Sequence, residues 1–139
     1  MFRLSNLIKT TLEDQKSRTL NGSIMIWNFT NRCNLLCHHC YSKADANEKD
    51  TLTFEEIEQT ISKLKAGGVN FFIFSGGEPL LRKDIFDIAK GIKEYNIMTY
   101  LSNNGIYVSP KNVDQIIETF NYIGISIDGI EEIHDQFRG

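Results

Sequence analysis

Three cysteines lie close together in the sequence and are the residues best suited to chemistry. Cys33, Cys37 and Cys40 follow a C-x3-C-x2-C spacing inside one polar loop, and the chain contains no other cysteine. Soft thiolates select zinc, copper(I) or iron–sulfur clusters. A structural zinc takes four protein ligands, whereas three thiolates on a four-iron cluster leave one iron free for an outside ligand. The trio therefore favours a cluster, with a Cys/His zinc site using His38 or His39, or buried core thiols, as the alternatives.

A second unusual segment is Gly76-Gly77-Glu78-Pro79, directly after a run of apolar residues. Its spacing fits neither a P-loop nor G-x-G-x-x-G, so phosphate binding is a poor interpretation. Two glycines let the backbone come close to a ligand, and the Glu78 carboxylate can accept hydrogen bonds from an ammonium group. The alternative is a tight turn between a strand and a helix, with a solvated Glu78.

Two more polar segments follow apolar runs, at residues 103–105 and 126–129. The first contains Asn104-Gly105, a pair that favours a turn with positive φ. In the second, the isoleucines at 123, 125 and 127 alternate with Ser126 and Asp128. If these isoleucines pack under the helices, Ser126 and Asp128 point into the site.

Hydrophobic periodicity predicts the elements that position these loops. Apolar runs predict strands at residues 23–29, 69–74, 97–101 and 122–127. A capping box of Thr53 with Glu56 begins a helix that Gly67-Gly68 ends, and further helices are expected at about 82–95, 112–120 and from 131. We expect these residues to be core: Trp27, Phe71, Phe72, Phe74, Ile85, Ile88, Ala89, Ile92, Val113, Ile116, Ile117 and Phe120.

Alternating strands and helices predict an α/β fold with a parallel sheet and right-handed crossovers. In such folds the ligand site lies at the carboxyl ends of the strands, where all four unusual segments fall. The spacing fits a (β/α) barrel or an open doubly wound sheet, and a barrel needs about 200 residues or more. The 139 residues are therefore expected to be the N-terminal portion of a partial (β/α) TIM-type barrel, with an amphipathic helix and lead-in at 1–22 and the core at 23–139.

Composition restricts the partners. The formal net charge is −3, and no stripe of Lys and Arg is present, so nucleic acid is not an expected partner. No segment approaches the ~20 apolar residues that span a bilayer, and the amphipathic start is not a signal peptide's apolar core. We expect no membrane partner and a cytoplasmic location, which also suits three clustered, unpaired cysteines.

The cysteine spacing after the first strand, together with Gly76-Gly77-Glu78-Pro79, resembles the two hallmarks of the radical S-adenosylmethionine (SAM) superfamily. The resemblance implies a [4Fe-4S] cluster held by Cys33, Cys37 and Cys40, with SAM bound to the open iron. Reductive cleavage of SAM would then give a 5'-deoxyadenosyl radical that abstracts a hydrogen from the substrate.

The resemblance also implies which residues bind SAM. His39 holds a position that lies beside the SAM adenine in the family, and Tyr41 follows the motif. Gly76, Gly77, Glu78 and Pro79 would bind the SAM amino group, and Asn104 and Ser126 are expected near SAM, Ser126 by its ribose and carboxylate. Arg138 is a weaker candidate, because an Arg in a helix more often makes a structural ion pair. No residue of the chain is expected to act as a catalyst in its own right.

The opening residues, the segment from Ile26 to Leu35 and the closing HDQFRG are similar to radical SAM enzymes of heme d1 and alternative heme biosynthesis. The resemblance implies a tetrapyrrole substrate, an electron donor such as a flavodoxin or ferredoxin, and a C-terminal auxiliary-cluster extension that is missing here. Peptide-modifying radical SAM maturases share most of these motifs and are the alternative. A non-catalytic iron–sulfur or zinc-binding module is a third hypothesis.

Overall fold

The structure, a computed structural model, describes residues 22–50 and 52–139. The helix expected within residues 1–22 falls almost wholly outside the described residues. The elements are β1 (Ser23–Thr30), α2 (Phe54–Ala66), β2 (Val69–Gly76), the 3-10 helix η1 (Pro79–Leu81), α3 (Ile85–Glu94), β3 (Met98–Asn103), α4 (Val113–Thr119), β4 (Tyr122–Ile125) and α5 (Glu131–Arg138).

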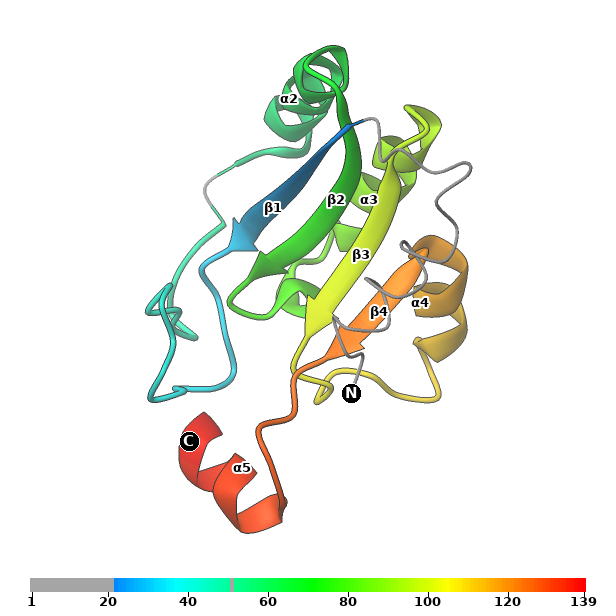
Figure 1. Ribbon diagram of the computed structural model, residues 1–139. Helices are drawn as coiled ribbons and strands as arrows, with labels where there is room; N and C mark the ends of the chain where they lie inside the picture. Colours follow the sequence, from blue (N-terminus) through cyan, green and yellow to red (C-terminus); the bar gives the residue numbers. More distant parts are fainter. Residues whose placement is uncertain (1–21, 51) are drawn as a thin grey trace.

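All four strands are parallel and lie in the order β1-β2-β3-β4. Each strand is joined to the next by a crossover that contains a helix, as the alternating pattern predicts. Figure 1 shows α2, α3 and α4 along one side of the sheet, with α5 apart from them beyond the carboxyl ends of the strands. This arrangement confirms the expected α/β class and the parallel sheet.

The core lies between the sheet and helices α2 to α4. Phe72 and Phe74 of β2 and Leu101 of β3 are fully buried against the inward faces of the helices, including Ile88 and Ile92 of α3. Burying a side chain of this size contributes about 1.5–3 kcal/mol. This face of the sheet therefore fixes the strands, and with them the starting points of the loops.

The first crossover helix is held by the cap that the sequence predicts. The backbone N–H of Thr53 donates to the Glu56 carboxylate at 2.9 Å, and the N–H of Glu56 donates to the Thr53 hydroxyl at 3.3 Å. Gly67 closes the other end of α2. A capping box satisfies two N–H groups that the helix itself leaves unpaired.

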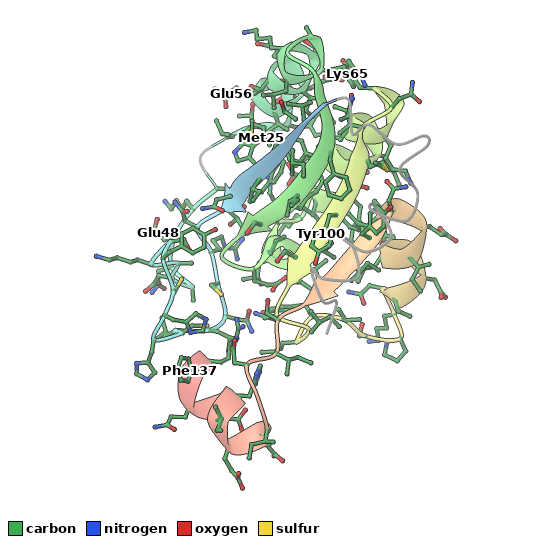
Figure 2. All side chains as sticks on the ribbon, in the orientation of Figure 1. Met25, Glu48, Glu56, Lys65, Tyr100 and Phe137 are labelled. Carbon is green, nitrogen blue, oxygen red and sulfur yellow. The ribbon has the colours of Figure 1, made fainter. Side chains whose placement is uncertain are left out.

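The other face of the sheet changes character along the strands. The part of this face further from the carboxyl ends is apolar and aromatic. In the strand register, Ile73 lies beside Tyr100, and Tyr100 lies beside Tyr122. Figure 2 shows Tyr100 on this face. One step closer to the carboxyl ends, the same register brings Asn28 beside Ser75 and Ser102 beside Gly124. The sheet thus offers small polar residues where its loops begin.

Several expected core residues lie elsewhere. Ile117 is 61% exposed, because α4 is only two turns long and turns Ile116 inward instead. Ile125 and Ile127 are also exposed, since β4 ends at Ile125 and none of the helices in residues 22–50 and 52–139 covers this stretch. Phe71 lies on the opposite face from the core, with its ring 5.6 Å from that of Tyr122.

Within residues 22–50 and 52–139, none of the helices combines the length and the apolar character that a membrane crossing requires.

Candidate cofactor site

The four unusual loops meet in one cavity of about 220 Å³ at the carboxyl ends of the strands. Its lining residues come from the cysteine loop, which we define as residues 31–50, from the ends of β2 and β3 and the residues that follow β3 and β4, and from α5. Figure 1 shows the cysteine loop beyond the carboxyl ends of the strands. The cavity is lined by Cys33, Leu35, Cys37, His39, Cys40, Tyr41, Ser42, Ser75, Gly76, Gly77, Ser102, Asn103, Asn104, Ser126 and Arg138. The structure therefore brings together all three cysteines and most of the other predicted site residues.

Backbone hydrogen bonds fix the end of β1 and the cysteine loop to the glycine turn, which we define as Gly76-Gly77-Glu78-Pro79. The N–H of Gly77 donates to the carbonyl of Thr30 and the N–H of Glu78 to that of Arg32, both at 2.8 Å. Within the loop, the N–H of Cys33 donates to the carbonyl of Asp45 at 3.2 Å. These bonds fix the position of Cys33 relative to β1.

The three thiols are free and differ in their surroundings. Cys33 is buried, whereas Cys37 and Cys40 are half-buried. Burial raises the pKa of the Cys33 thiol. A hydrogen bond with the Ser42 hydroxyl, at 3.3 Å, lowers the pKa of the Cys40 thiol. Cys40 is therefore the more readily ionised of these two thiols, and the thiolate is the form that binds metal.

The donor set fits a cluster better than a single ion. Thiolates around one zinc ion bond it at about 2.3 Å, so their sulfurs crowd together. In the described ranges, no group of three or more His, Cys, Asp or Glu side chains is arranged to hold a metal ion. Cysteines on a four-iron cluster bond different irons and stand further apart. The three thiols line one cavity, so they can serve as ligands to one cluster.

Gly76 and Gly77 are glycines for a steric reason. Gly76 has φ of +137°, a conformation that side chains rarely adopt. A Cβ atom on Gly77 would overlap the carbonyl group of Arg32 in the cysteine loop. The pair therefore allows two loops to touch, in addition to exposing backbone to the cavity.

Glu78 has a different position from the one expected. Its side chain is 0% exposed and does not line the cavity. One carboxylate oxygen accepts from the N–H of Leu80 at 3.0 Å and the other from the N–H of Asn104 at 2.9 Å. Burial raises the pKa of Glu78, and these two hydrogen bonds oppose the shift. Because the carboxylate faces the backbone, its geometry suits joining the loops after β2 and β3 rather than receiving an ammonium group.

Asn104 links three loops. Its side-chain amide donates to Oδ1 of Asn34 at 2.9 Å, and its Oδ1 accepts from the N–H of Ile106 at 3.0 Å. Asn103 similarly donates to the carbonyl of Gly124 at 3.0 Å. Asn104 does reach the cavity, but its side chain is already engaged by the protein. The sequence analysis missed Asn34, which only the tertiary contact reveals.

His39 and Tyr41 both line the cavity. The Tyr41 hydroxyl donates to Oδ1 of Asn28 at 3.0 Å, although the residue is 75% exposed. The His39 ring lies 5.4 Å from that of Phe137 in α5. Pro79 is buried at the first position of η1, away from the cavity, so it shapes the turn.

Three serines at neighbouring strand ends line the cavity, namely Ser75, Ser102 and Ser126. Sequence reasoning identified Ser126 alone. Ser75 and Ser102 were missed because a serine at a strand end carries little signal. Asp128, expected in the site, instead forms an ion pair with Arg138.

A buried arginine beneath the site was also missed. Arg82 is 3% exposed and donates to the backbone carbonyls of Phe29 and Leu52 and to the carboxylate of Asp84. These bonds join the end of β1 to the approach to α2. Arg82 therefore supports both ends of the cysteine loop.

The sequence model of the radical SAM superfamily matches residues 27–139. The chain belongs to the radical SAM superfamily. The matched range includes both radical SAM hallmarks, the cysteine trio and the glycine turn, and the three cysteines, Gly76 and Gly77 line the cavity.

Curated relatives point in the same direction. The chain is 40% identical to "Pre-heme d1 synthase" of Dinoroseobacter shibae, over all of this chain and 36% of that protein. It is 38% identical to "Fe-coproporphyrin III synthase" of Methanosarcina barkeri, over 84% of this chain and 30% of that protein. The chain thus spans about a third of the length of these relatives.

Solved radical SAM structures share the fold. A histidine-tagged anSMEcpe with bound AdoMet, which is SAM, superposes with a TM-score of 0.67 at 24% identity, over 84% of this chain and 35% of that one. SuiB of Streptococcus suis bound to S-adenosylmethionine gives 0.68 at 18% identity, over 96% of this chain and 32% of that one. At this identity the likeness concerns the fold, which confirms the expected partial barrel.

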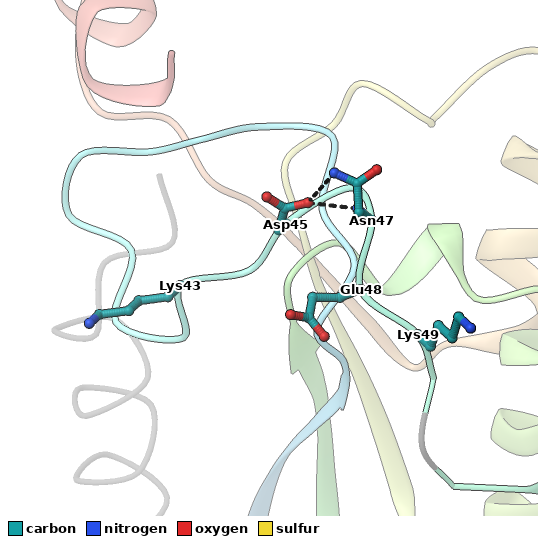
Figure 3. A pocket seen from close by; sticks show the side chains of 5 residues that line it. All are labelled: Lys43, Asp45, Asn47, Glu48 and Lys49. Carbon is teal, nitrogen blue, oxygen red and sulfur yellow. Dashed lines mark hydrogen bonds between the residues drawn. The ribbon is translucent and has the colours of Figure 1, made fainter.

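A second hollow lies on the outer side of the cysteine loop. It is lined by Lys43, Asp45, Asn47, Glu48 and Lys49, and Figure 3 shows the two lysines pointing in different directions. Asp45 accepts from both the N–H and the side-chain amide of Asn47. These groups hold the loop and carry mixed charge, so this hollow adds nothing to the radical SAM site.

Proposed function

We propose that Cys33, Cys37 and Cys40 hold a [4Fe-4S] cluster and that SAM binds beside it in the cavity. The observation that carries the proposal is the placement of all three thiols around the same 220 Å³ cavity as Gly76, Gly77 and Ser126. A zinc-binding module would need neither the glycine turn nor a cavity next to the cysteines.

A reduced cluster of this kind supplies the electron that cleaves a carbon–sulfur bond of SAM and releases a 5'-deoxyadenosyl radical. The chain's own part is to bind, orient and shield. Three thiolates from the cysteine loop would leave one iron of a four-iron cluster open for SAM. The backbone of Gly76 and Gly77 lines the same cavity, and its carbonyl groups could accept hydrogen bonds from the SAM amino group.

The remaining cavity residues have proposed roles of two kinds. His39 and Tyr41 provide ring surfaces at the mouth of the cavity for the adenine, and Ser126 offers a hydroxyl for the ribose or carboxylate. Glu78 and Asn104 hold the loops at the spacing that SAM requires, since their side chains already bond to the protein. Glu78 thus acts by position, without touching SAM.

We further propose that the whole enzyme acts on a tetrapyrrole, with electrons from a protein such as a flavodoxin or ferredoxin. The support is the identity to "Pre-heme d1 synthase" and to "Fe-coproporphyrin III synthase". On the sheet face that carries Tyr100, Met98 of β3 and Tyr122 of β4 are exposed, and these side chains are compatible with a flat hydrophobic substrate.

A peptide substrate is the second candidate. SuiB, which has the same fold, has been solved bound to its precursor peptide SuiA. "Mycofactocin maturase MftC" of Mycobacterium tuberculosis is 28% identical over 92% of this chain. The lower identity ranks this substrate class behind the tetrapyrroles.

Anaerobic reconstitution with iron and sulfide tests the cofactor proposal. We expect about four irons per chain and a reduced-state electron paramagnetic resonance signal that changes when SAM is added. Zinc binding without sulfide, or a signal indifferent to SAM, would reject it. The substrate is tested separately, by supplying the complete enzyme with a siroheme-derived tetrapyrrole or a precursor peptide and measuring 5'-deoxyadenosine.

A further inference from the structure

Helix α5 reaches back to the cysteine loop. The carbonyl of Phe137 accepts a hydrogen bond from the backbone N–H of His38 at 3.0 Å, and the Phe137 ring lies 5.4 Å from that of His39. Figure 2 shows Phe137 where α5 meets this loop. His38 and His39 are the two residues between Cys37 and Cys40, so α5 contacts the part of the loop that sets the spacing of these two thiols.

Within the part of the chain that the structure describes, little hydrophobic packing holds α5 in place. None of its residues is buried, and Ile133 and Phe137 are both nearly half exposed. In Figure 1 the helix stands apart from the layer formed by α2, α3 and α4. Among residues 22–50 and 52–139, the contacts that hold α5 besides the Phe137 ring are therefore chiefly polar and lie near its ends.

Those contacts come from the loop that joins β4 to α5. Nε of Arg138, in the last turn, donates to Oδ2 of Asp128 at 2.5 Å. The N–H of Asp128 donates to Nδ1 of His134 at 3.3 Å, one turn earlier. The Arg138 side chain is 15% exposed, so this ion pair is better shielded than most surface pairs. The ion pair thus ties the loop before α5 to the last turn of the helix, and Phe137 lies in the segment between the two paired residues.

We propose that Asp128 and Arg138 are positioning residues that hold α5 against the cysteine loop and thereby set the spacing of Cys37 and Cys40. The importance of that spacing for a cluster rests on the proposed function. The ion pair fixes the helix direction, the helix places the Phe137 carbonyl, and that carbonyl orders the backbone at His38. Arg138, which also lines the cavity, thus contributes to the spacing of the cysteines through Asp128 and the loop.

Amide hydrogen exchange of the cluster-free chain tests the contact without any cofactor. In Asp128→Asn we expect the His38 amide to exchange at least about tenfold faster, since its acceptor is no longer held. The Cys33 amide, bonded to Asp45 in the same loop, should be unchanged, and so should the Leu101 amide in the sheet. Unchanged exchange at His38 would overturn the proposal, as would equal acceleration at Leu101.

Two further variants separate positioning from general damage. Glu132→Gln removes a charge from the exposed side of α5 and should leave His38 exchange at the wild-type rate. The charge-swapped double variant, Asp128→Arg with Arg138→Asp, should recover most of the protection of the His38 amide that either single change loses. Faster exchange of the His38 amide in Glu132→Gln would contradict a specific ion pair, and so would a charge-swapped variant that recovers no protection.

Reconstitution then links the contact to the cofactor. If Asp128→Asn takes up fewer irons and shows a weaker SAM-dependent change in its resonance signal, the positioning role is supported. Normal cluster and SAM responses in that variant would reject it. A wild-type chain that forms no cluster would reject the proposed function, while the exchange result would still decide whether the ion pair orders the loop.

Discussion

The backbone N–H of Asn104 donates to the buried carboxylate of Glu78 at 2.9 Å, across two neighbouring strand ends. Through this bond a residue of the glycine turn holds the loop after β3. Asn104 in turn holds Asn34 of the cysteine loop through its side-chain amide. Three loops that are distant in the sequence are therefore joined by one chain of hydrogen bonds beneath the proposed SAM site.

Replacing Glu78 by Gln should weaken this connection. The amide keeps one acceptor oxygen but turns an NH2 group toward the other backbone N–H, which leaves a buried donor unpaired. We expect a loss of about 1–3 kcal/mol in the free energy of unfolding. Urea denaturation of the cluster-free chain measures it, and an unchanged midpoint would show that the two bonds contribute little.

The same variant gives a pH dependence. Burial raises the pKa of Glu78 above its ordinary value of 4.5, so above pH 4.5 the native state retains a proton that the unfolded chain releases. Stability from this group therefore falls as the pH rises from 4.5 through the raised pKa. The unfolding free energy of the wild type minus that of Glu78→Gln should decrease over this range. A constant or increasing difference would contradict the raised pKa.

The contact between Asn34 and Asn104 can be measured by a double-mutant cycle. Replacing either residue by Ala removes their side-chain hydrogen bond, so the two losses should not add. We expect a coupling of about 0.5–1.5 kcal/mol in the free energy of unfolding. Fully additive losses would mean that the two loops are not held together by this bond.

Gly77→Ala should disturb the site more than a glycine change of the same size elsewhere. Its new methyl group would meet the carbonyl of Arg32, forcing the cysteine loop to move, with a cost of about 1–3 kcal/mol. Gly91→Ala in α3 is the matched control, because nothing lies within 4 Å of its added Cβ. That control should gain about 0.5–1 kcal/mol. Equal effects in thermal unfolding would contradict the close loop contact.

Cys37→Ala should abolish the brown colour of the reconstituted chain. Loss of one of three thiolates leaves the cluster with two protein ligands, which is too few for stable binding. Visible absorbance and iron content measure the outcome. Ser62→Ala, on the exposed side of α2, serves as the control and should reconstitute normally. A variant that keeps its full absorbance would exclude Cys37 as a ligand.

Local sequence determined the elements and the chemical groups of this protein. Alternating apolar runs and helical faces are short-range patterns, so the strands, the cap at Thr53 and the inward side of α3 could be predicted. The same holds for the three thiols, since they occupy one loop. Which side chains turn toward the core was less predictable, as the exposed Ile117 and Ile125 show. Burial depends on which neighbouring element covers a residue.

Tertiary structure alone decided which polar groups face the cavity and which hold its walls. Glu78 carries a carboxylate of the kind that binds ligands. In the structure this carboxylate accepts hydrogen bonds from two backbone N–H groups, because a buried charged group must be paired. Asn34, Ser75 and Arg82 carry no sequence signal of their role. Their partners lie in other loops, and only the parallel sheet, which brings all its carboxyl ends to one edge, puts them within reach.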